Sequence, residues 1–179
     1  HFLFTSFRNN GEDGLHLALS EDGYRWTVLQ SDRSFLKPVI GENKLMRDPC
    51  LAQGPDGVFH LVWTCGWTAG QAKLLGHAYS RDLLTWSEQQ GIQVMENEPQ
   101  TRNIWAPELF YDTAKAQWLI FWSSTIPGRF PQTDATGDDG YNHRAYVTTT
   151  KDFARFTPSR LFFDPGYNII DATLLAAEG

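Results

Sequence analysis

The chain has 179 residues, a hydrophobic fraction of 41% and a formal net charge of −6. This length is enough for one domain with its own core, and the hydrophobic content argues against a disordered chain. The negative charge, with no run of Lys or Arg, argues against nucleic acid or an anionic lipid surface as a partner. No apolar run approaches the ~18 residues of a membrane span. We therefore expect neither nucleic acid nor a membrane as partner.

Aromatic residues, glycine and proline indicate the fold class. Seven Trp, twelve Phe, fifteen Gly and nine Pro favour short strands and tight turns over helices, so an all-β fold is expected. The first strand is predicted in "HFLFTSF" at residues 1–7. Any export signal would lie upstream of it, so the residues do not reveal the compartment.

Residues 44–64, "KLMRDPCLAQGPDGVFHLVWT", predict two strands joined by a Gly-Pro-Asp-Gly turn. Strand chemistry does not require the Arg-Asp-Pro at the start, which is either a turn opener or a functional group. Folding this hairpin about its turn places Cys50 opposite roughly position 61. Cys50 and Cys65 are then out of register for a disulfide, and both are expected to be free thiols.

Two sequence frames recur along the chain. The first is a short strand, Ser or Thr, a charged residue, Asp, three variable residues and an aromatic residue, which is Trp26, Trp86 or Phe156 at spacings of 60 and 70. Trp26 and Trp86 recur in register and are expected to be structural. The frame appears in "LALSEDGYRWTVL", "HAYSRDLLTWSEQ" and "YVTTTKDFARFTPS".

The second frame is a strand followed by a turn, in "RDPCLAQGPDGVFHLVWT", "WAPELFYDTAKAQWLIFWS" and "IDATLLAAEG". We call its first residues, Asp48, Ala106 and Asp171, the leading positions; their spacings are 58 and 65. Each combined unit holds about four strand-sized segments, which is typical of a β-propeller blade.

The repeat also predicts how much of a propeller is present. The first segment matches the second strand of the later units, since Thr5, Thr64 and Ser123 line up, so the chain is expected to begin partway through a blade. Residues 1–179 are then a single truncated domain of about three blades, because a ring of five would need roughly 300 residues.

The inner strands of a propeller run along its axis, so the leading positions are expected to meet at one end of the central channel. This arrangement brings Asp48 and Asp171 together. Glu108 lies two residues beyond Ala106 and shares a strand face with it.

In order and spacing, "RDP", "WAPELFYD" and "IDATLL" resemble glycoside hydrolase family 43, and the resemblance covers essentially the whole chain. It implies a five-bladed β-propeller of which this chain is the N-terminal portion, an inverting mechanism, and arabinofuranosyl, xylosyl or related sugars as substrate. Asp48 would be the general base, and Asp171 would orient the general acid and tune its pKa. The resemblance also implies a secreted or periplasmic protein.

The general-acid glutamate of the family belongs to a motif in the next blade, and no such motif follows Asp171. Glu178 lies seven residues away, about 23 Å along a strand, and is interpreted as a surface residue. The acid is therefore expected beyond residue 179, and the chain alone is predicted to be inactive.

Several further residues are candidates for substrate binding. Trp67 and Trp105 either stack on sugar rings or pack between blades. Arg47 either donates to a substrate hydroxyl or pairs with Asp48, and His143 is either a substrate ligand or a loop residue. Glu108 replaces the Asp of many relatives and is expected to contact sugar. No cofactor is predicted. No metal site is predicted either, because the acidic groups Glu12-Asp13 and Asp134-Asp138-Asp139 lack the ligand spacing of an EF-hand loop.

Two alternatives remain. A non-catalytic carbohydrate-binding or protein-binding propeller would keep the aromatic residues without needing Asp at two leading positions. The retaining fructan hydrolases also use an Arg-Asp-Pro, but they require an Asn-Asp-Pro before it and a Glu-Cys after it, and neither is visible.

Overall fold

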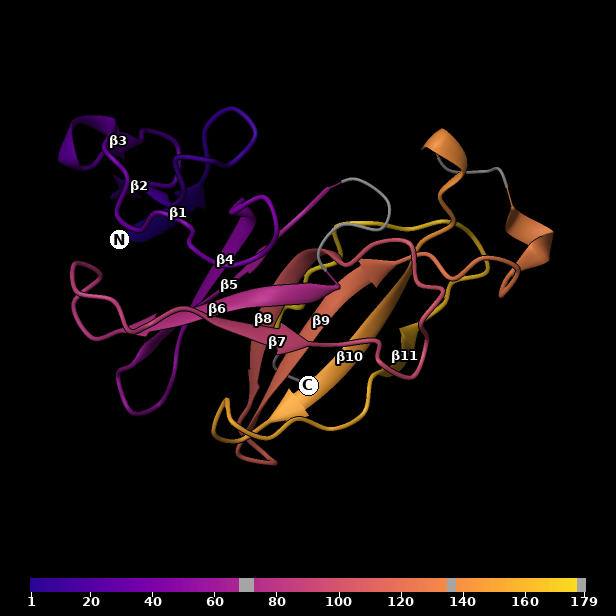
Figure 1. Cartoon of the computed structure of the whole chain (residues 1–179). Coiled ribbons are helices and arrows are strands. Elements are labelled where there is room, and N and C mark those ends of the chain that lie inside the picture. Colours follow the sequence, from indigo (N-terminus) through magenta and orange to yellow (C-terminus); the bar gives the residue numbers. More distant parts are fainter. Residues whose placement is uncertain (68–72, 135–137, 177–179) are drawn as a thin grey trace.

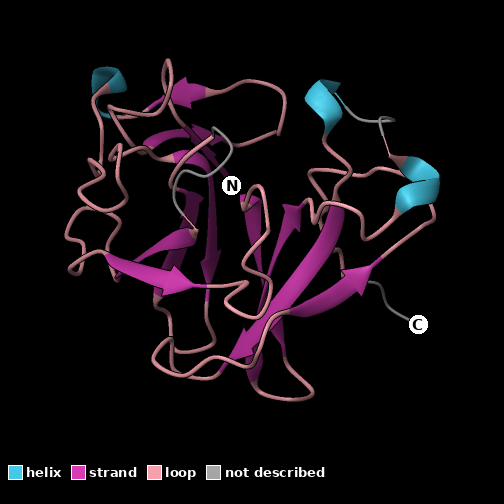
Figure 2. Ribbon diagram, turned by 45° about the vertical axis from the view of Figure 1, so that its right-hand side comes forward, coloured by secondary structure: helices cyan, strands magenta, loops and turns pink. Residues whose placement is uncertain are grey.

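The structure, a computed structural model, describes residues 1–67, 73–134 and 138–176. These residues form strands, loops and the single-turn 3₁₀ helices η1 (Gln30–Asp32), η2 (Pro131–Thr133) and η3 (Asp138–Gly140). Figure 2 shows how strands and loops dominate the fold. No helix in this part of the chain is long and apolar enough to cross a membrane. The all-β prediction is confirmed.

The strands form three antiparallel sheets that follow one another in chain order (Figure 1). The first sheet contains β1 (Phe2–Ser6), β2 (His16–Ser20) and β3 (Thr27–Val28). The second contains β4 (Arg47–Gln53), β5 (Phe59–Thr64), β6 (Leu74–Ser80) and β7 (Gln90–Gln93). The third contains β8 (Trp105–Asp112), β9 (Gln117–Ser124), β10 (Arg144–Thr150) and β11 (Arg160–Phe163).

Each sheet is one propeller blade, so the chain forms an incomplete propeller of about three blades. The inner strands β4 and β8 contact each other, and β1 contacts β4. The first sheet begins with β1, which occupies the place of β5 and β9 in the later sheets. Among the described residues, the first sheet therefore has no strand in the place of β4 and β8.

The first sequence frame is a hydrogen-bonded turn between the two outer strands of a blade. In each copy the Ser or Thr hydroxyl accepts the N–H of the residue three positions on, which has a left-handed φ. The Asp carboxylate accepts the next two N–H groups. These bonds explain why the two polar residues recur. The hydroxyl and carboxylate pairs are Ser20 and Asp22, Ser80 and Asp82, and Thr150 and Asp152.

Two apolar cores fill the spaces between adjacent sheets. Successive residues of a strand point to opposite faces, so β5 supplies both cores. Leu61 and Trp63 pack with Leu15, Leu17 and Met46 on one side, while Val62 packs with Ile120 and Trp122 on the other. This two-sided burial explains the continuous apolar run in "FHLVWT".

Both cysteines are free, as predicted. Cys50 lies opposite Val62, one position from the expected partner, because the turn at residues 54–58 sets the register of residues 50–53 against 59–62. Cys65 follows the last residue of β5. Cys50 pairs with Val62 and not with Cys65 in the ladder between β4 and β5, so the two thiols do not face each other.

One element of the second frame was predicted wrongly. Its third copy, "IDATLLAAEG", was expected to begin with a strand, but residues 164–176 contain none. A strand requires a neighbour that pairs with its N–H and C=O groups, and within the described ranges no segment pairs with this one. Glu178 lies outside the described residues.

Candidate active site

The leading positions share an unusual backbone conformation. Asp48, Ala106 and Asp171 have φ of 48°, 48° and 57°, in the left-handed region. Irregularities in the ladder accompany the first two, between Arg47 and Cys50 and between Trp105 and Glu108. A bulge with a left-handed residue turns the side chain away from the alternating pattern of the strand. The three leading positions thus share a left-handed backbone, and two of them lie at irregularities of the inner strands.

Asp48, Glu108 and Asp171 line one cavity of about 340 Å³. They come from three successive copies of the second frame, and the structure brings them together although up to 123 positions separate them in sequence. The remaining lining residues belong to β1, the two inner strands and the segment after β11; they are Thr5, Pro49, Cys50, Leu51, Ala106, Pro107 and Ala172. The cavity therefore lies where inner strands of adjacent blades meet.

Opposing influences act on the Asp48 carboxyl group. Burial raises the pKa of Asp48 above its ordinary value, and the negative charge of Asp171 raises it further. A hydrogen bond from the Thr64 hydroxyl at 3.0 Å and the positive charge of Arg47 lower the pKa and partly oppose this rise. Asp48 is thus a carboxyl group in a partly desolvated site with a second acidic group close by.

Arg47 acts on Asp48 through its charge. Its Nη1 donates to Asn10 Oδ1 at 2.8 Å, and its guanidinium lies 5.1 Å above the centre of the Phe7 ring. Across the described ranges, no ion pair joins Arg47 to Asp48. The expected alternative of direct pairing is therefore wrong, because Asn10 and Phe7 hold the guanidinium elsewhere.

Contacts with the start of β10 position the segment that carries Asp171. The guanidinium of Arg144, which is fully buried, forms an ion pair with Asp164. Further along, the Asn168 side chain accepts the His143 N–H at 2.6 Å, and the Ile169 N–H donates to the His143 carbonyl at 3.3 Å. These contacts hold a segment without strand partners in place next to the cavity.

Trp105 and His143 belong to an aromatic cluster with Tyr141 rather than to the cavity lining. The Trp105 and Tyr141 ring centres are 4.6 Å apart, and those of Tyr141 and His143 are 5.1 Å apart in a stacked arrangement. Trp105 Nε1 also donates to the Gly66 carbonyl at 3.1 Å. His143 is only 4% exposed, and burial lowers its pKa to about 4, so its ring is neutral near pH 7.

Trp67 follows the end of β5 and is 47% exposed. It does not line the cavity with Asp48. Of the seven predicted site residues, the structure brings only Asp48, Glu108 and Asp171 together around one cavity.

Sequence reasoning missed Thr5 and Cys50, which line the cavity, and Thr64, which contacts Asp48 from behind the lining. The Thr64 hydroxyl contacts the Asp48 carboxylate, and the Thr5 hydroxyl donates to the Pro49 carbonyl at 2.5 Å. The alignment of Thr5 with Thr64 was the available signal, but it served only to define the repeat. Cys50 accepts the Leu109 N–H at 3.4 Å, and burial raises its pKa to about 11, so it is a neutral thiol.

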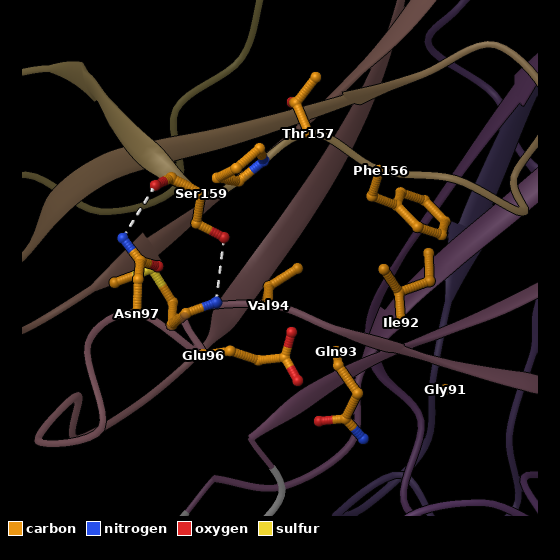
Figure 3. Close-up of a pocket in the computed structure, with 11 residues that line it drawn as sticks. Gly91, Ile92, Gln93, Val94, Glu96, Asn97, Phe156, Thr157 and Ser159 are labelled. Carbon is orange, nitrogen blue, oxygen red and sulfur yellow. Dashed lines mark hydrogen bonds between the residues drawn. The ribbon is translucent and has the colours of Figure 1, made fainter.

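A larger cavity of about 480 Å³ lies between the end of β7 and the connection from β10 to β11 (Figure 3). Its walls are residues 91–97 and 156–159, where Ser159 accepts an N–H from Asn97 and another from Met95. Glu96 is the one carboxylate of its lining. A single carboxylate does not supply an acid and a base, so the smaller cavity is the candidate active site. In the described part of the chain, no group of three or more metal-binding side chains is close enough to hold an ion.

Comparison with known proteins gives similarities to carbohydrate-active enzymes. An alpha-L-arabinofuranosidase of Bifidobacterium longum subsp. longum is 28% identical over 129 residues, which are 66% of this chain and 12% of that protein. A crystal structure of alpha-L-arabinofuranosidase from Lactobacillus brevis matches with a TM-score of 0.55 at 20% identity, covering 74% of this chain and 41% of that chain.

An N-acetylgalactosamine deacetylase from F. plautii, solved in complex with blood group B trisaccharide, matches with a TM-score of 0.56 at 19% identity. This match covers 84% of this chain and 44% of that chain. At these identities the two solved structures support the fold alone, and this chain spans less than half of each.

The sequence model of a family related to glycoside hydrolase family 43, described as "Probable glycosyl hydrolase domain", matches residues 1–179. The match extends over the three blades and all three leading positions. The chain therefore belongs to this family of glycosyl hydrolase domains.

Proposed function

We propose that the protein containing this chain is an inverting glycosidase that releases arabinofuranosyl, xylosyl or related residues from oligosaccharides or polysaccharides. The observation that carries the proposal is the set of three carboxyl groups around one cavity of about 340 Å³. The family membership supports glycoside hydrolysis, and the similarity to an arabinofuranosidase favours an arabinofuranosyl substrate.

In the proposed reaction, Asp48 is the general base. A water molecule attacks the anomeric carbon while Asp48 takes one of its protons, and the bond from that carbon to the leaving oxygen breaks. A general acid on the opposite side of the sugar protonates the leaving oxygen. The acid and the base of inverting enzymes are about 6.5–9.5 Å apart, which leaves room for the water molecule.

Asp171 is proposed to orient the general acid and to keep it protonated by like-charge repulsion. The position of Asp171 in the lining of the same cavity supports this role, as does its charge, which raises the pKa of Asp48. The acid itself is proposed to be a glutamate of a further blade. The chain by itself is therefore expected to be inactive.

Glu108 is proposed to accept hydrogen bonds from sugar hydroxyl groups, because it lines the same cavity. Trp67 presents an exposed aromatic surface that suits stacking on a sugar ring. Trp105 and His143 are proposed to shape the neighbouring wall through their contacts with Tyr141. Arg47 is proposed to favour the ionised form of Asp48 by its charge, without contacting it.

A non-catalytic sugar-binding propeller is the competing proposal. The fold alone does not identify the function, because the F. plautii protein of similar fold carries the name of a deacetylase and not of a glycosidase. A binding module has no need for a carboxylate whose pKa is raised by burial and by a second acid, and this feature of Asp48 favours the glycosidase.

The test uses the full-length protein on aryl arabinofuranosides and aryl xylosides. Asp48→Asn is expected to lower kcat by about 10²–10⁴-fold while sugar binding, measured by calorimetry, is nearly retained. Asp22→Asn is the matched control: it removes a turn carboxylate outside the cavity and keeps an oxygen that accepts the same N–H groups. This control is expected to keep full kcat.

Proton NMR of the first product is expected to show the inverted anomer. Binding without turnover by the wild-type protein would favour the sugar-binding module instead. Near-full kcat in Asp48→Asn would remove Asp48 from the mechanism.

A further inference from the structure

Thr64 connects two of the three leading positions, Asp48 and Ala106. It is the last residue of β5, lies opposite Arg47 in the ladder and is 1% exposed. Its Oγ1 accepts the Ala106 N–H at 2.9 Å and donates to Asp48 Oδ2 at 3.0 Å. One hydroxyl thus joins the backbone of β8 to the carboxylate of β4.

The chemistry of these partners determines the direction of both bonds. A backbone N–H can only donate, so the Ala106 amide occupies an acceptor site of the Thr64 oxygen. The single proton of the hydroxyl is then available to the carboxylate, which accepts it. The left-handed conformation of Ala106 aims its N–H at Thr64, and the buried position of Thr64 keeps water from competing.

We infer that Thr64 is a positioning residue for Asp48, whose hydroxyl supplies a fixed donor that orients the carboxylate in the cavity. This inference rests on the proposed function only in giving Asp48 the role of base. The geometry itself, a buried donor held from behind by an amide, is independent of the reaction.

The arrangement has a consequence for ionisation. A base must be ionised to take a proton, and both burial and the charge of Asp171 raise the pKa of Asp48. A hydrogen bond to the charged form lowers the pKa, so the Thr64 hydroxyl lowers the pKa of Asp48 against these two influences. Thr64 thereby extends the pH range over which Asp48 can act to more acidic values.

Thr5 provides an internal comparison. It occupies the same place in the preceding blade and lines the same cavity, but its hydroxyl donates to the Pro49 carbonyl rather than to a carboxylate. The hydroxyl at this place is thus a contact between adjacent blades in both cases, and only that of Thr64 reaches an ionisable group.

The experiment measures the pKa of Asp48 by NMR of ¹³C-labelled Asp carboxyl groups in the full-length protein, with the Asp48 signal assigned from its loss in Asp48→Asn. Thr64→Val keeps the shape of the side chain and removes the donor. It is expected to raise the pKa of Asp48 by about one unit, the size of a hydrogen bond to a charged group. Thr64→Ser restores the hydroxyl and is expected to stay within a few tenths of the wild type.

Thr5→Val is the matched control and is expected to leave the pKa of Asp48 unchanged. Repeating the Thr64 series with Asp171→Asn separates the effect from the coupled titration of the two aspartates. Where Thr64→Val does not fold, Thr64→Ala provides the same comparison with a smaller side chain.

An unchanged pKa in Thr64→Val or Thr64→Ala, or an equal rise in Thr5→Val, would overturn the inference. In an active full-length enzyme, the acidic limb of kcat/KM is expected to move by the same amount as the pKa measured by NMR. A pKa rise in an inactive wild-type protein would reject the proposed function while supporting the role of Thr64.

Discussion

Gly76 is the position where the structure predicts the sharpest effect of adding one methyl group. Gly76 of β6 lies opposite Trp63 of β5, and the Trp63 side chain is fully buried. A Cβ at Gly76 would lie 1.9 Å from Cε2 of the indole and 2.3 Å from its Nε1. Carbon atoms of packed side chains ordinarily stay about 3.5–4.0 Å apart. The ring of Trp63 must therefore move in Gly76→Ala.

The cost follows from how little space the core leaves. Overpacking a core typically costs about 1–3 kcal/mol, and an overlap this large with a buried ring places Gly76→Ala at about 3 kcal/mol or more. For a chain of this length, the melting temperature falls by about 2–4 °C for each kcal/mol, so we expect a decrease of about 6–12 °C.

Urea unfolding followed by tryptophan fluorescence and circular dichroism measures this cost. Gly91→Ala is the matched control, since Gly91 lies opposite Gly76 on β7 and its added Cβ would meet Leu74 methyl groups at 3.4 Å, an ordinary contact. Its free energy of unfolding is expected to stay within about 0.5 kcal/mol of the wild type.

A double-mutant cycle with Trp63→Leu tests the cause. The smaller side chain makes room for the methyl group, so the double variant is expected to lose at least about 1 kcal/mol less than the sum of the single variants. A Gly76→Ala protein as stable as the wild type, or a strictly additive double variant, would refute the packing of Trp63 over Gly76.

Three further predictions concern ionisable groups. Burial lowers the pKa of His60 to about 4 and of His77 to about 3, so the unfolded chain binds more protons and the urea midpoint should fall as pH decreases from about 6.5 to 5. Replacing His77 with Gln should reduce this slope, whereas an unchanged slope would contradict it. Burial raises the pKa of Cys50 to about 11 and of Cys65 to about 12. A disulfide reagent at pH 8 should therefore label the folded protein at least ~100-fold more slowly than the unfolded chain. Rapid labelling of the folded protein would contradict the burial of the thiols. Hydrogen bonds from backbone N–H groups lower the pKa of Asp82 to about 2, which carboxyl NMR can measure. Asp82→Ala should lower the melting temperature more than Asp82→Asn, which keeps an oxygen that accepts these N–H groups. Equal decreases in the two variants would contradict a stabilising role of these hydrogen bonds.

The repeat made much of the fold and part of the site predictable. A blade needs the same turn and the same strand order each time, so Ser80 and Asp82 recur as Thr150 and Asp152 and define the period. The period then relates Asp48 to Asp171 without any knowledge of the fold between them. Both residues line one cavity because residues at the same position in successive blades lie close together around the propeller axis.

The features that were predicted wrongly or missed depend on contacts that do not recur from blade to blade. Asp171 lies in an irregular segment because its position relies on His143 and Arg144 rather than on strand pairing. Arg47 turns toward Asn10, which no repeat relates to it. Thr64 was visible in the alignment, but its bond to Asp48 depends on a bulge and a left-handed φ that apolar patterning does not encode.

The turns between the outer strands have a consequence for the order of folding. Their hydrogen bonds join residues two or three positions apart, as from Leu83 to Ser80, so closing them costs little chain entropy. The bond from Ala106 to Thr64 spans 42 positions and must await the docking of two blades. We therefore expect the outer hairpins to form early and the cavity to be completed late, after the rate-limiting step. Substitutions in the cavity wall should therefore speed unfolding and leave the folding rate nearly unchanged, so that the residues around Asp48 are free to vary without slowing the formation of the blades.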